Sequence, residues 1–212
     1  MEDLNISTEE FCKKYVKDEK GWYYFWKAFF TPLAFIIFRP KIYGKENIPE
    51  QGRVILASNH IHMADPAYLV LSTKRVVRFL AKRELLDSIL GSIYKGLCAI
   101  PVDRKNGAHN SLVAAEYALN KGEVIGIYPE GTRNRNNPLN LLPFKYGTVK
   151  LASETHTPVV PVGFVSKGRP FIDDYKVYIG KPYYIEKDAD LDKENEILRE
   201  KILELITKKE KV

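Results

Sequence analysis

Short apolar runs alternate with amphipathic segments along most of the chain after residue 41. An apolar run bounded by polar residues is typical of a buried strand, whereas apolar residues spaced three and four apart are typical of a helix. These patterns predict strands at 53–58, 76–81, 97–102, 123–128, 158–165 and 176–179, and helices at 111–120, 145–154 and 192–209. Because strands and helices alternate, we predict the α/β class, with a mostly parallel sheet flanked by helices.

The first 40 residues have a different pattern. Ser7 and Glu10 form a capping-box sequence, which predicts a helix running to about residue 18. From 22 to 38 the apolar side chains point in almost every direction, and this run holds nine of the 25 aromatic residues. Lys27 and Pro32 interrupt it, and we expect Pro32 to kink or break the helix. The part without a charged residue, 28–38, is too short to cross a bilayer.

Basic residues flank this aromatic run. They are Lys13, Lys14, Lys17 and Lys20 before it, and Arg39, Lys41 and Lys45 after it. Tryptophan and tyrosine prefer the headgroup level of a bilayer, and each basic side chain near an anionic leaflet contributes about 1 kcal/mol of attraction. We therefore predict that residues 1–40 form an interfacial helical element on an anionic membrane surface, and that 41–212 form the α/β domain. The alternative is a pair of helices that pack only against the core.

Composition narrows the partners. The 212 residues are 45% hydrophobic and carry a net charge of +6, which favours an anionic partner: nucleic acid, a membrane surface or a phosphorylated substrate. A basic nucleic-acid-binding module would interleave its aromatics along a strand, and here they form one block, so nucleic acid is not expected. The acidic first ten residues do not resemble a secretory signal, and two cysteines make a disulfide framework implausible. We therefore expect peripheral or monotopic attachment at the cytoplasmic face of the cell membrane.

Two chemically active side chains follow the strand predicted at 53–58. His60 and Asp65 are five residues apart, so Asp65 can hold one imidazole nitrogen and leave the other as a general base. No Ser or Cys lies between them, which suggests that the nucleophile is a hydroxyl of the substrate. One alternative is that Asp65 only caps the next helix. A metal site at His60, His62 and Asp65 is disfavoured, because His109 and His156 are the only other histidines.

Basic residues also lie near the predicted strand ends. Lys82 follows the second strand, Arg104 the third and Arg133 the fourth, while Lys145 stands where the next helix begins. Gly131 allows a close backbone approach or a positive φ. A guanidinium fork, a lysine and free helical N–H groups are all suited to a phosphate. The alternative for each is a solvated surface charge.

Four motifs together resemble those of the glycerolipid acyltransferases, and most closely the bacterial 1-acylglycerol-3-phosphate acyltransferases. The motifs are His60 with Asp65, then PVDR at 101–104, YPEGTR at 128–133 and PVVP at 158–161. The resemblance covers roughly residues 40 to 180, and it is specific because four motifs occur in order.

The resemblance implies roles for particular residues. His60 would deprotonate the acceptor hydroxyl, Asp65 would orient it, and Lys82 would stabilise charge near the reacting carbonyl. The glycerol phosphate would be bound by Arg104, Glu130, Gly131, Thr132 and Arg133. Lys145, where a predicted helix begins, is a further candidate for binding the phosphate.

The resemblance also implies the partners. The donor would be acyl-CoA or acyl-ACP, the acceptor lysophosphatidate or another lysolipid or glycerol phosphate, and no metal or cofactor would be needed. The N-terminal element would dock on the membrane. Two positions depart from the family pattern: His62 stands where Ser is usual, and Asn134 where Ser often follows the arginine. Both lie beside the predicted site, so they leave the acceptor open.

Overall fold

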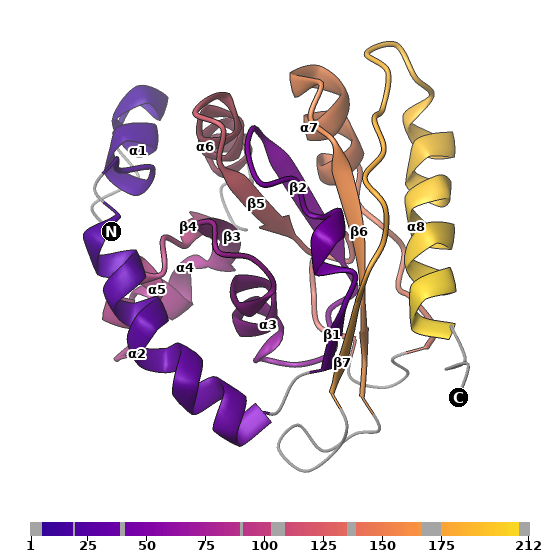
Figure 1. Cartoon of the computed structure of the whole chain (residues 1–212). Helices are drawn as coiled ribbons and strands as arrows, with labels where there is room; N and C mark the ends of the chain where they lie inside the picture. Colours follow the sequence, from indigo (N-terminus) through magenta and orange to yellow (C-terminus); the bar gives the residue numbers. More distant parts are fainter. Residues whose placement is uncertain are drawn as a thin grey trace.

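The computed structural model describes residues 6–18, 20–38, 41–89, 91–102, 109–134, 139–166 and 175–207 (Figure 1). Its helices are α1 (Thr8–Tyr15), α2 (Gly21–Phe38), α3 (Asp65–Ser72), α4 (Arg83–Leu86), α5 (Gly91–Gly96), α6 (His109–Asn120), α7 (Gly147–Thr155) and α8 (Leu191–Thr207). Its strands are β1 (Lys41–Tyr43), β2 (Val54–Ser58), β3 (Val77–Lys82), β4 (Ile100–Val102), β5 (Val124–Ile127), β6 (Val159–Val165) and β7 (Lys176–Ile179). A 3₁₀ turn spans Lys45–Asn47.

The described strands form one sheet in the order β1-β7-β6-β2-β5-β3-β4. All neighbouring pairs are parallel except β6 and β7, which are antiparallel. The predicted α/β class with a mostly parallel sheet is confirmed. The strand predicted at 97–102 is shorter, because Cys98 has a φ of 59° and belongs to the turn after α5.

Each face of the sheet has its own apolar core. Successive side chains of a strand point to opposite faces, so neighbouring residues belong to different cores. Ile55 and Ala57 of β2 belong to a core that also contains side chains from α1, α6, α7 and α8. Val54 and Leu56 point to the opposite face and pack with side chains of α2 and α3. Figure 1 shows the same arrangement, with α6, α7 and α8 on one side of the sheet and α2 and α3 on the other.

Helix α1 is part of the core on the α6 side. Ser7 caps it by accepting the N–H of Glu10, and Glu10 accepts the N–H of Ser7 in return, so the capping box forms as predicted. The helix ends at Tyr15, three residues earlier than expected. Phe11 and Cys12 are buried within the core. The chain before residue 40 therefore supplies packing to the sheet as well as an exposed surface.

Helix α2 continues through Pro32 without ending there. Its inner face is anchored by Tyr23, which is fully buried and whose hydroxyl accepts the N–H of Val77 and donates to the carbonyl of Arg75. Lys27 donates to the carbonyl of Thr73 at 2.6 Å. Among the described residues, no helix is both long and apolar enough to cross a bilayer.

Candidate active site

The site begins where β2 ends. Asn59 is fully buried, and its amide exchanges two hydrogen bonds with the backbone of Phe164 in the neighbouring strand β6. This contact fixes the direction in which the chain leaves the sheet. His60 follows at once, at the carboxyl edge of a mostly parallel sheet, where ligands of open α/β folds bind.

Asp65, the first residue of α3, holds His60 by its side chain. Its Oδ2 lies 2.6 Å from Nδ1 of His60 and also accepts the N–H groups of Ile61 and His62 at 2.8 and 3.0 Å. Because an ionised carboxylate only accepts, Nδ1 carries the proton and Nε2 is left as an acceptor. Asp65 is fully buried, whereas the His60 side chain keeps 18% of its surface exposed. The Asp65 carboxylate therefore bonds to residues that precede α3. It does not cap the helix, and no side-chain hydrogen bond is made at the N-cap, Ala64.

The loop of residues 128–133 holds His60 by its main chain. The carboxylate of Glu130 accepts the His60 N–H at 2.9 Å, and the His60 carbonyl accepts the N–H of Asn134 at 2.7 Å. The second oxygen of Glu130 accepts the N–H of Leu142 at 2.9 Å. Within the loop the N–H of Gly131 bonds to the carbonyl of Tyr128, and Gly131 has a φ of 66°. The turn therefore requires a residue that tolerates the left-handed region.

Two tyrosines complete the surroundings of the pair. The ring of Tyr128 stacks on the His60 imidazole, with centroids 4.1 Å apart and planes 21° apart. Tyr175, which directly precedes β7, donates its hydroxyl to Oδ1 of Asp65. Burial is the main cause that raises the pKa of both phenols well above the ordinary value, and the charge of Asp65 adds to it. Both hydroxyls stay protonated at neutral pH.

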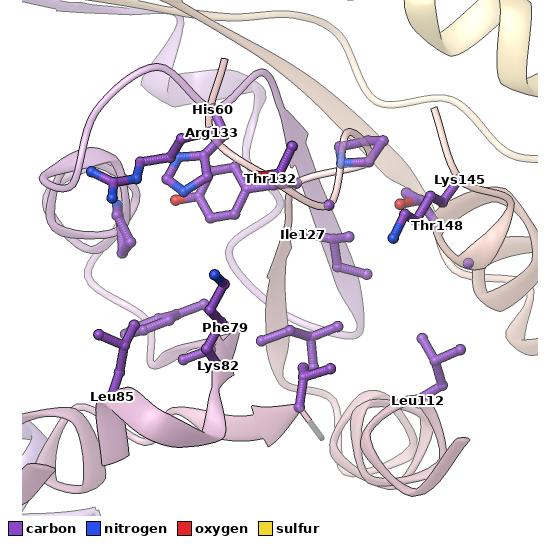
Figure 2. A pocket seen from close by; sticks show the side chains of 18 of the residues that line it. His60, Phe79, Lys82, Leu85, Leu112, Ile127, Thr132, Arg133, Lys145 and Thr148 are labelled. Atoms are coloured by element: carbon purple, nitrogen blue, oxygen red, sulfur yellow. The ribbon is translucent and has the colours of Figure 1, made fainter. Parts of the chain in front are cut away.

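His60 opens into a cavity of about 730 Å³ (Figure 2). In that view His60, Thr132 and Arg133 lie along the top, Lys82 extends from below toward them, and Lys145 and Thr148 lie to the right. Much of the remaining lining is apolar and comes from Phe79, Leu80, Ala81, Val102, Leu112 and Ile127. The cavity thus combines a basic, hydrogen-bonding side with an apolar side.

The structure brings together most of the predicted site residues. His60, Lys82, Gly131, Thr132, Arg133 and Lys145 all line the cavity. Arg104 lies outside the described residues. Glu130, predicted to bind the substrate directly, is 3% exposed and does not line the cavity. Both of its carboxylate oxygens accept backbone N–H groups. A carboxylate would also repel a phosphate.

Two residues of the cavity lining have buried hydroxyls with no hydrogen bond to the described part of the chain. These hydroxyls belong to Tyr128 and to Thr148, in the first turn of α7. A buried polar group without a partner is costly, so these two are suited to a bound ligand. The described residues contain no group of three or more His, Cys, Asp or Glu placed to hold a metal ion.

The two positions that depart from the family pattern both have structural contacts. Nδ1 of His62 accepts the N–H of Ala64 at 3.1 Å. Burial lowers the pKa of His62, against the opposing effect of Asp65 and with the help of Arg133 and His60. Asn134 is 5% exposed and donates its side-chain N–H to the carbonyl of Asn140 at 2.7 Å. Neither side chain belongs to the cavity lining.

Four residues of the site were not predicted from the sequence: Asn59, Tyr128, Thr148 and Tyr175. Tyr128 precedes the PEGTR string directly, and Asn59 precedes His60, so proximity to a motif was the available signal. Thr148 follows Gly147 at the start of a predicted helix. Tyr175 is 110 residues from Asp65 in the chain, and no local pattern links the two.

An oriented His–Asp pair at the strand edge of an α/β sheet, beside a basic cavity, defines an enzyme that activates a group on its substrate. A family model described as Acyltransferase matches residues 39–165, more than half of the chain. The chain belongs to this acyltransferase family.

Curated relatives and one solved structure agree with this assignment. The 1-acyl-sn-glycerol-3-phosphate acyltransferase of Bacillus subtilis is 31% identical over 150 residues, covering 68% of this chain and 73% of the relative. The enzyme of that name from Borreliella burgdorferi is 32% identical over 173 residues, covering 76% and 68%. The fold matches the crystal structure of the 1-acyl-sn-glycerophosphate acyltransferase PlsC from Thermotoga maritima, with a TM-score of 0.67 and 22% identity over 92% of this chain and 85% of that one.

Proposed function

We propose that the protein transfers a fatty acyl group from an acyl thioester to the free hydroxyl of 1-acylglycerol-3-phosphate, giving phosphatidic acid for phospholipid synthesis. The observation that carries the proposal is the 2.6 Å contact between His60 Nδ1 and Asp65 Oδ2 beside a basic cavity. The names of the two bacterial relatives supply the acceptor. The donor is acyl-CoA or acyl carrier protein, since both present the same thioester.

In the proposed reaction His60 is the general base. Its Nε2 takes the proton of the acceptor hydroxyl as that oxygen attacks the thioester carbonyl carbon. The carbonyl oxygen becomes an oxyanion, near which the Lys82 ammonium supplies positive charge; such stabilisation is typically worth a few kcal/mol. The carbon–sulfur bond then breaks, and His60 returns the proton to the leaving thiolate, which departs as a thiol. Asp65 keeps the imidazole in the required tautomer throughout.

The cavity lining suits the two halves of the acceptor. Arg133 and Lys145 offer charge to the phosphate, and the hydroxyl of Thr148 and the first-turn N–H groups of α7 offer hydrogen bonds. We also propose Arg104 as a phosphate ligand, and only the resemblance of its PVDR motif to the family supports this role. The apolar side of the cavity, from Phe79 to Leu112, is suited to an acyl chain.

An acceptor panel tests this proposal. Purified protein with one labelled acyl-CoA is offered 1-acylglycerol-3-phosphate, glycerol 3-phosphate, a lyso-aminolipid and 1-acylglycerol, and the experiment is repeated with acyl-ACP. The highest kcat/KM for 1-acylglycerol-3-phosphate, with phosphatidic acid as the product, is the expected result. Equal or faster transfer to 1-acylglycerol would contradict the phosphate-binding roles. A preference for another phosphorylated acceptor would retain the chemistry and change the substrate.

The outer face of α2 supports peripheral attachment to a membrane. Its exposed apolar residues recur three and four apart and so form one stripe along the helix: Trp22, Phe25, Phe29, Leu33 and Ile36. Trp22 keeps 70% of its surface exposed, and Ile36 keeps 69%. A continuous exposed apolar stripe on a basic protein is typical of an interfacial helix. We place this element, within residues 1–40, on the cytoplasmic face of the cell membrane.

Vesicle binding tests the membrane element. Deleting the N-terminal segment would also remove the buried side chains of α1, so substitutions on the stripe are the cleaner variants. Trp22→Ser, Phe25→Ser and Phe29→Ser together are expected to release the protein from phosphatidylglycerol vesicles in a flotation assay, with an unchanged thermal midpoint. Tyr184→Ser, at a 56% exposed tyrosine of the α/β domain, is the matched control and is expected to bind normally. Undiminished binding of the triple variant would contradict the proposal.

A further inference from the structure

Tyr175 makes the only contact to Oδ1 of Asp65 among the described hydrogen bonds. The other oxygen, Oδ2, already serves His60 and the N–H groups of Ile61 and His62. Tyr175, the residue directly before β7, donates its hydroxyl to Oδ1. With one oxygen held on each side, the carboxylate has little freedom to rotate and turn Oδ2 away from the imidazole.

The Tyr175 hydroxyl is itself held in place. The ring is 1% exposed and stacks on Tyr68 of α3, with centroids 4.0 Å apart and planes 13° apart. Phe164 packs on it at 6.0 Å, and the Tyr175 carbonyl accepts the N–H of Lys41 at 3.0 Å. Packing of the ring fixes the position of the hydroxyl oxygen, and the O–H then turns toward its acceptor. Such support for a reacting group is typical of preorganised sites.

The hydrogen bond also changes the charge that Asp65 presents to His60. A donor on Oδ1 draws negative charge from Oδ2, because charge-assisted hydrogen bonds polarise one another across a carboxylate. The charged or titratable groups near the pair are His62, Tyr68, Tyr128 and Arg133. The carboxylate of Glu130 also accepts the His60 N–H, and Lys82 lines the cavity into which His60 opens. Among the described hydrogen bonds, only that of Tyr175 joins a side chain other than His60 to the carboxylate.

We propose that Tyr175 is a positioning residue for His60, acting through Asp65: it fixes the carboxylate on the imidazole and moderates its charge. This proposal rests on the proposed function for its kinetic consequence, but its structural consequence is independent of any substrate.

The test compares Tyr175→Phe with Tyr183→Phe. Tyr183 is a matched control, because its hydroxyl is also buried and has no hydrogen bond within the described part of the chain. Tyr175→Phe is expected to lower kcat by about 5- to 30-fold while both KM values stay within about twofold. The acidic limb of its kcat/KM profile is expected to move to higher pH, since Oδ2 then holds the imidazolium more strongly. Tyr183→Phe is expected to match the wild type in kcat, in both KM values and in the pH profile of kcat/KM.

Proton NMR gives a readout that needs no substrate. The His60 Nδ1–H bond to Asp65 is expected to give a low-field resonance that is lost in Asp65→Asn and moves further downfield in Tyr175→Phe. In an Asp65→Asn background, Tyr175→Phe is expected to change kcat by less than about twofold. If Tyr175→Phe does not fold, 3,5-difluorotyrosine at this position keeps the ring and strengthens the donor, so the resonance is expected to move upfield.

Wild-type kcat and an unmoved resonance in Tyr175→Phe would overturn the proposal. So would a loss of kcat that is equally large in the Asp65→Asn background. If the protein transfers no acyl group to any acceptor, the proposed function fails, while the resonance still confirms or overturns the contact through Asp65.

Discussion

The carboxylate of Glu130 accepts the backbone N–H of His60 at 2.9 Å, so a residue of the PEGTR string holds the base by its main chain. The second oxygen bonds to the N–H of Leu142. Because Glu130 is buried and outside the cavity lining, the string has two separate tasks. Glu130 and Gly131 shape the loop, whereas Gly131, Thr132 and Arg133 line the cavity.

Glu130→Ala is expected to lower kcat by at least about tenfold and to leave the acceptor KM within about threefold. Two backbone N–H groups lose their acceptor, each at a cost of about 1–3 kcal/mol, and His60 loses its placement. Steady-state kinetics and thermal unfolding measure the two effects. Arg133→Met is the contrasting variant and is expected to raise the acceptor KM. A rise confined to acceptor KM in Glu130→Ala would instead indicate direct substrate binding.

Tyr128 is expected to stabilise His60 in its protonated form. An aromatic face near a cation contributes about 0.5–2 kcal/mol, and the ring lies 4.1 Å from the imidazole. Tyr128→Leu should therefore lower kcat by about 3- to 30-fold. Tyr128→Phe keeps the ring and is expected to have a kcat similar to that of the wild type. A changed acceptor KM in this variant would indicate that the Tyr128 hydroxyl bonds to the acceptor. Equal kcat for Leu and Phe variants would show that stacking has no catalytic effect.

Gly131→Ala is expected to weaken acceptor binding. Gly131 has a φ of 66°, and an added Cβ would lie 2.9 Å from Cε of Lys145. The Lys145 side chain must move, and alanine in the left-handed region costs about 1–2 kcal/mol in conformational energy. We expect an acceptor KM raised by about three- to tenfold, similar to Lys145→Met. An unchanged KM in both variants would remove Lys145 from the phosphate site.

Arg78 and Glu123 form a buried ion pair that also ties α1 to the sheet. Arg78 donates to Glu123 and to the carbonyls of Tyr15, the last residue of α1, and Lys17. Lys20 lies 2.8 Å from Glu123. Removing one partner leaves a buried charge, so Arg78→Met is expected to cost about 3–5 kcal/mol of unfolding free energy. Glu9→Gln, in the exposed pair with Lys13, is the control and should leave the unfolding free energy almost unchanged, because solvent screens that pair.

The same pair predicts a pH dependence. Burial alone raises the pKa of Glu123, but hydrogen bonds and charges from Arg78 and Lys20 outweigh it, so its pKa lies below the ordinary value of 4.5. A carboxylate whose pKa is lowered on folding contributes stability above its unfolded pKa and loses it as the pH falls through the folded value. The stability difference between the wild type and Arg78→Met/Glu123→Gln should therefore shrink below about pH 4.5, as measured by urea unfolding. A constant difference from pH 7 to pH 3 would contradict this.

Local pattern predicted most of the sheet because buried strands are continuous apolar runs, as in Ile55 and its neighbours in β2. It missed β1, whose three residues are too short to form a pattern. For α2 it predicted apolar side chains on almost every side, but not which face packs against the sheet. The sequence shows the residue types on each face, but only the fold shows which face is covered.

The sequence predicted those site residues that lie within recognisable motifs. His60 and Asp65 are five apart, so their contact follows from a single turn. The role of Glu130 depends on where the His60 N–H lies after folding, which spacing does not determine. Tyr175 reaches Asp65 only because β7 pairs with β6, and that pairing is a property of the whole sheet.

The central claim is that His60, held by Asp65, activates the acceptor hydroxyl. The most direct measurement is the rate at which His60→Ala transfers a labelled acyl group from acyl-CoA to 1-acylglycerol-3-phosphate, compared with the wild type. A loss of about 10²- to 10⁴-fold in kcat, with unchanged circular dichroism and thermal midpoint, is the predicted result. Transfer by His60→Ala at a rate near that of the wild type would contradict it.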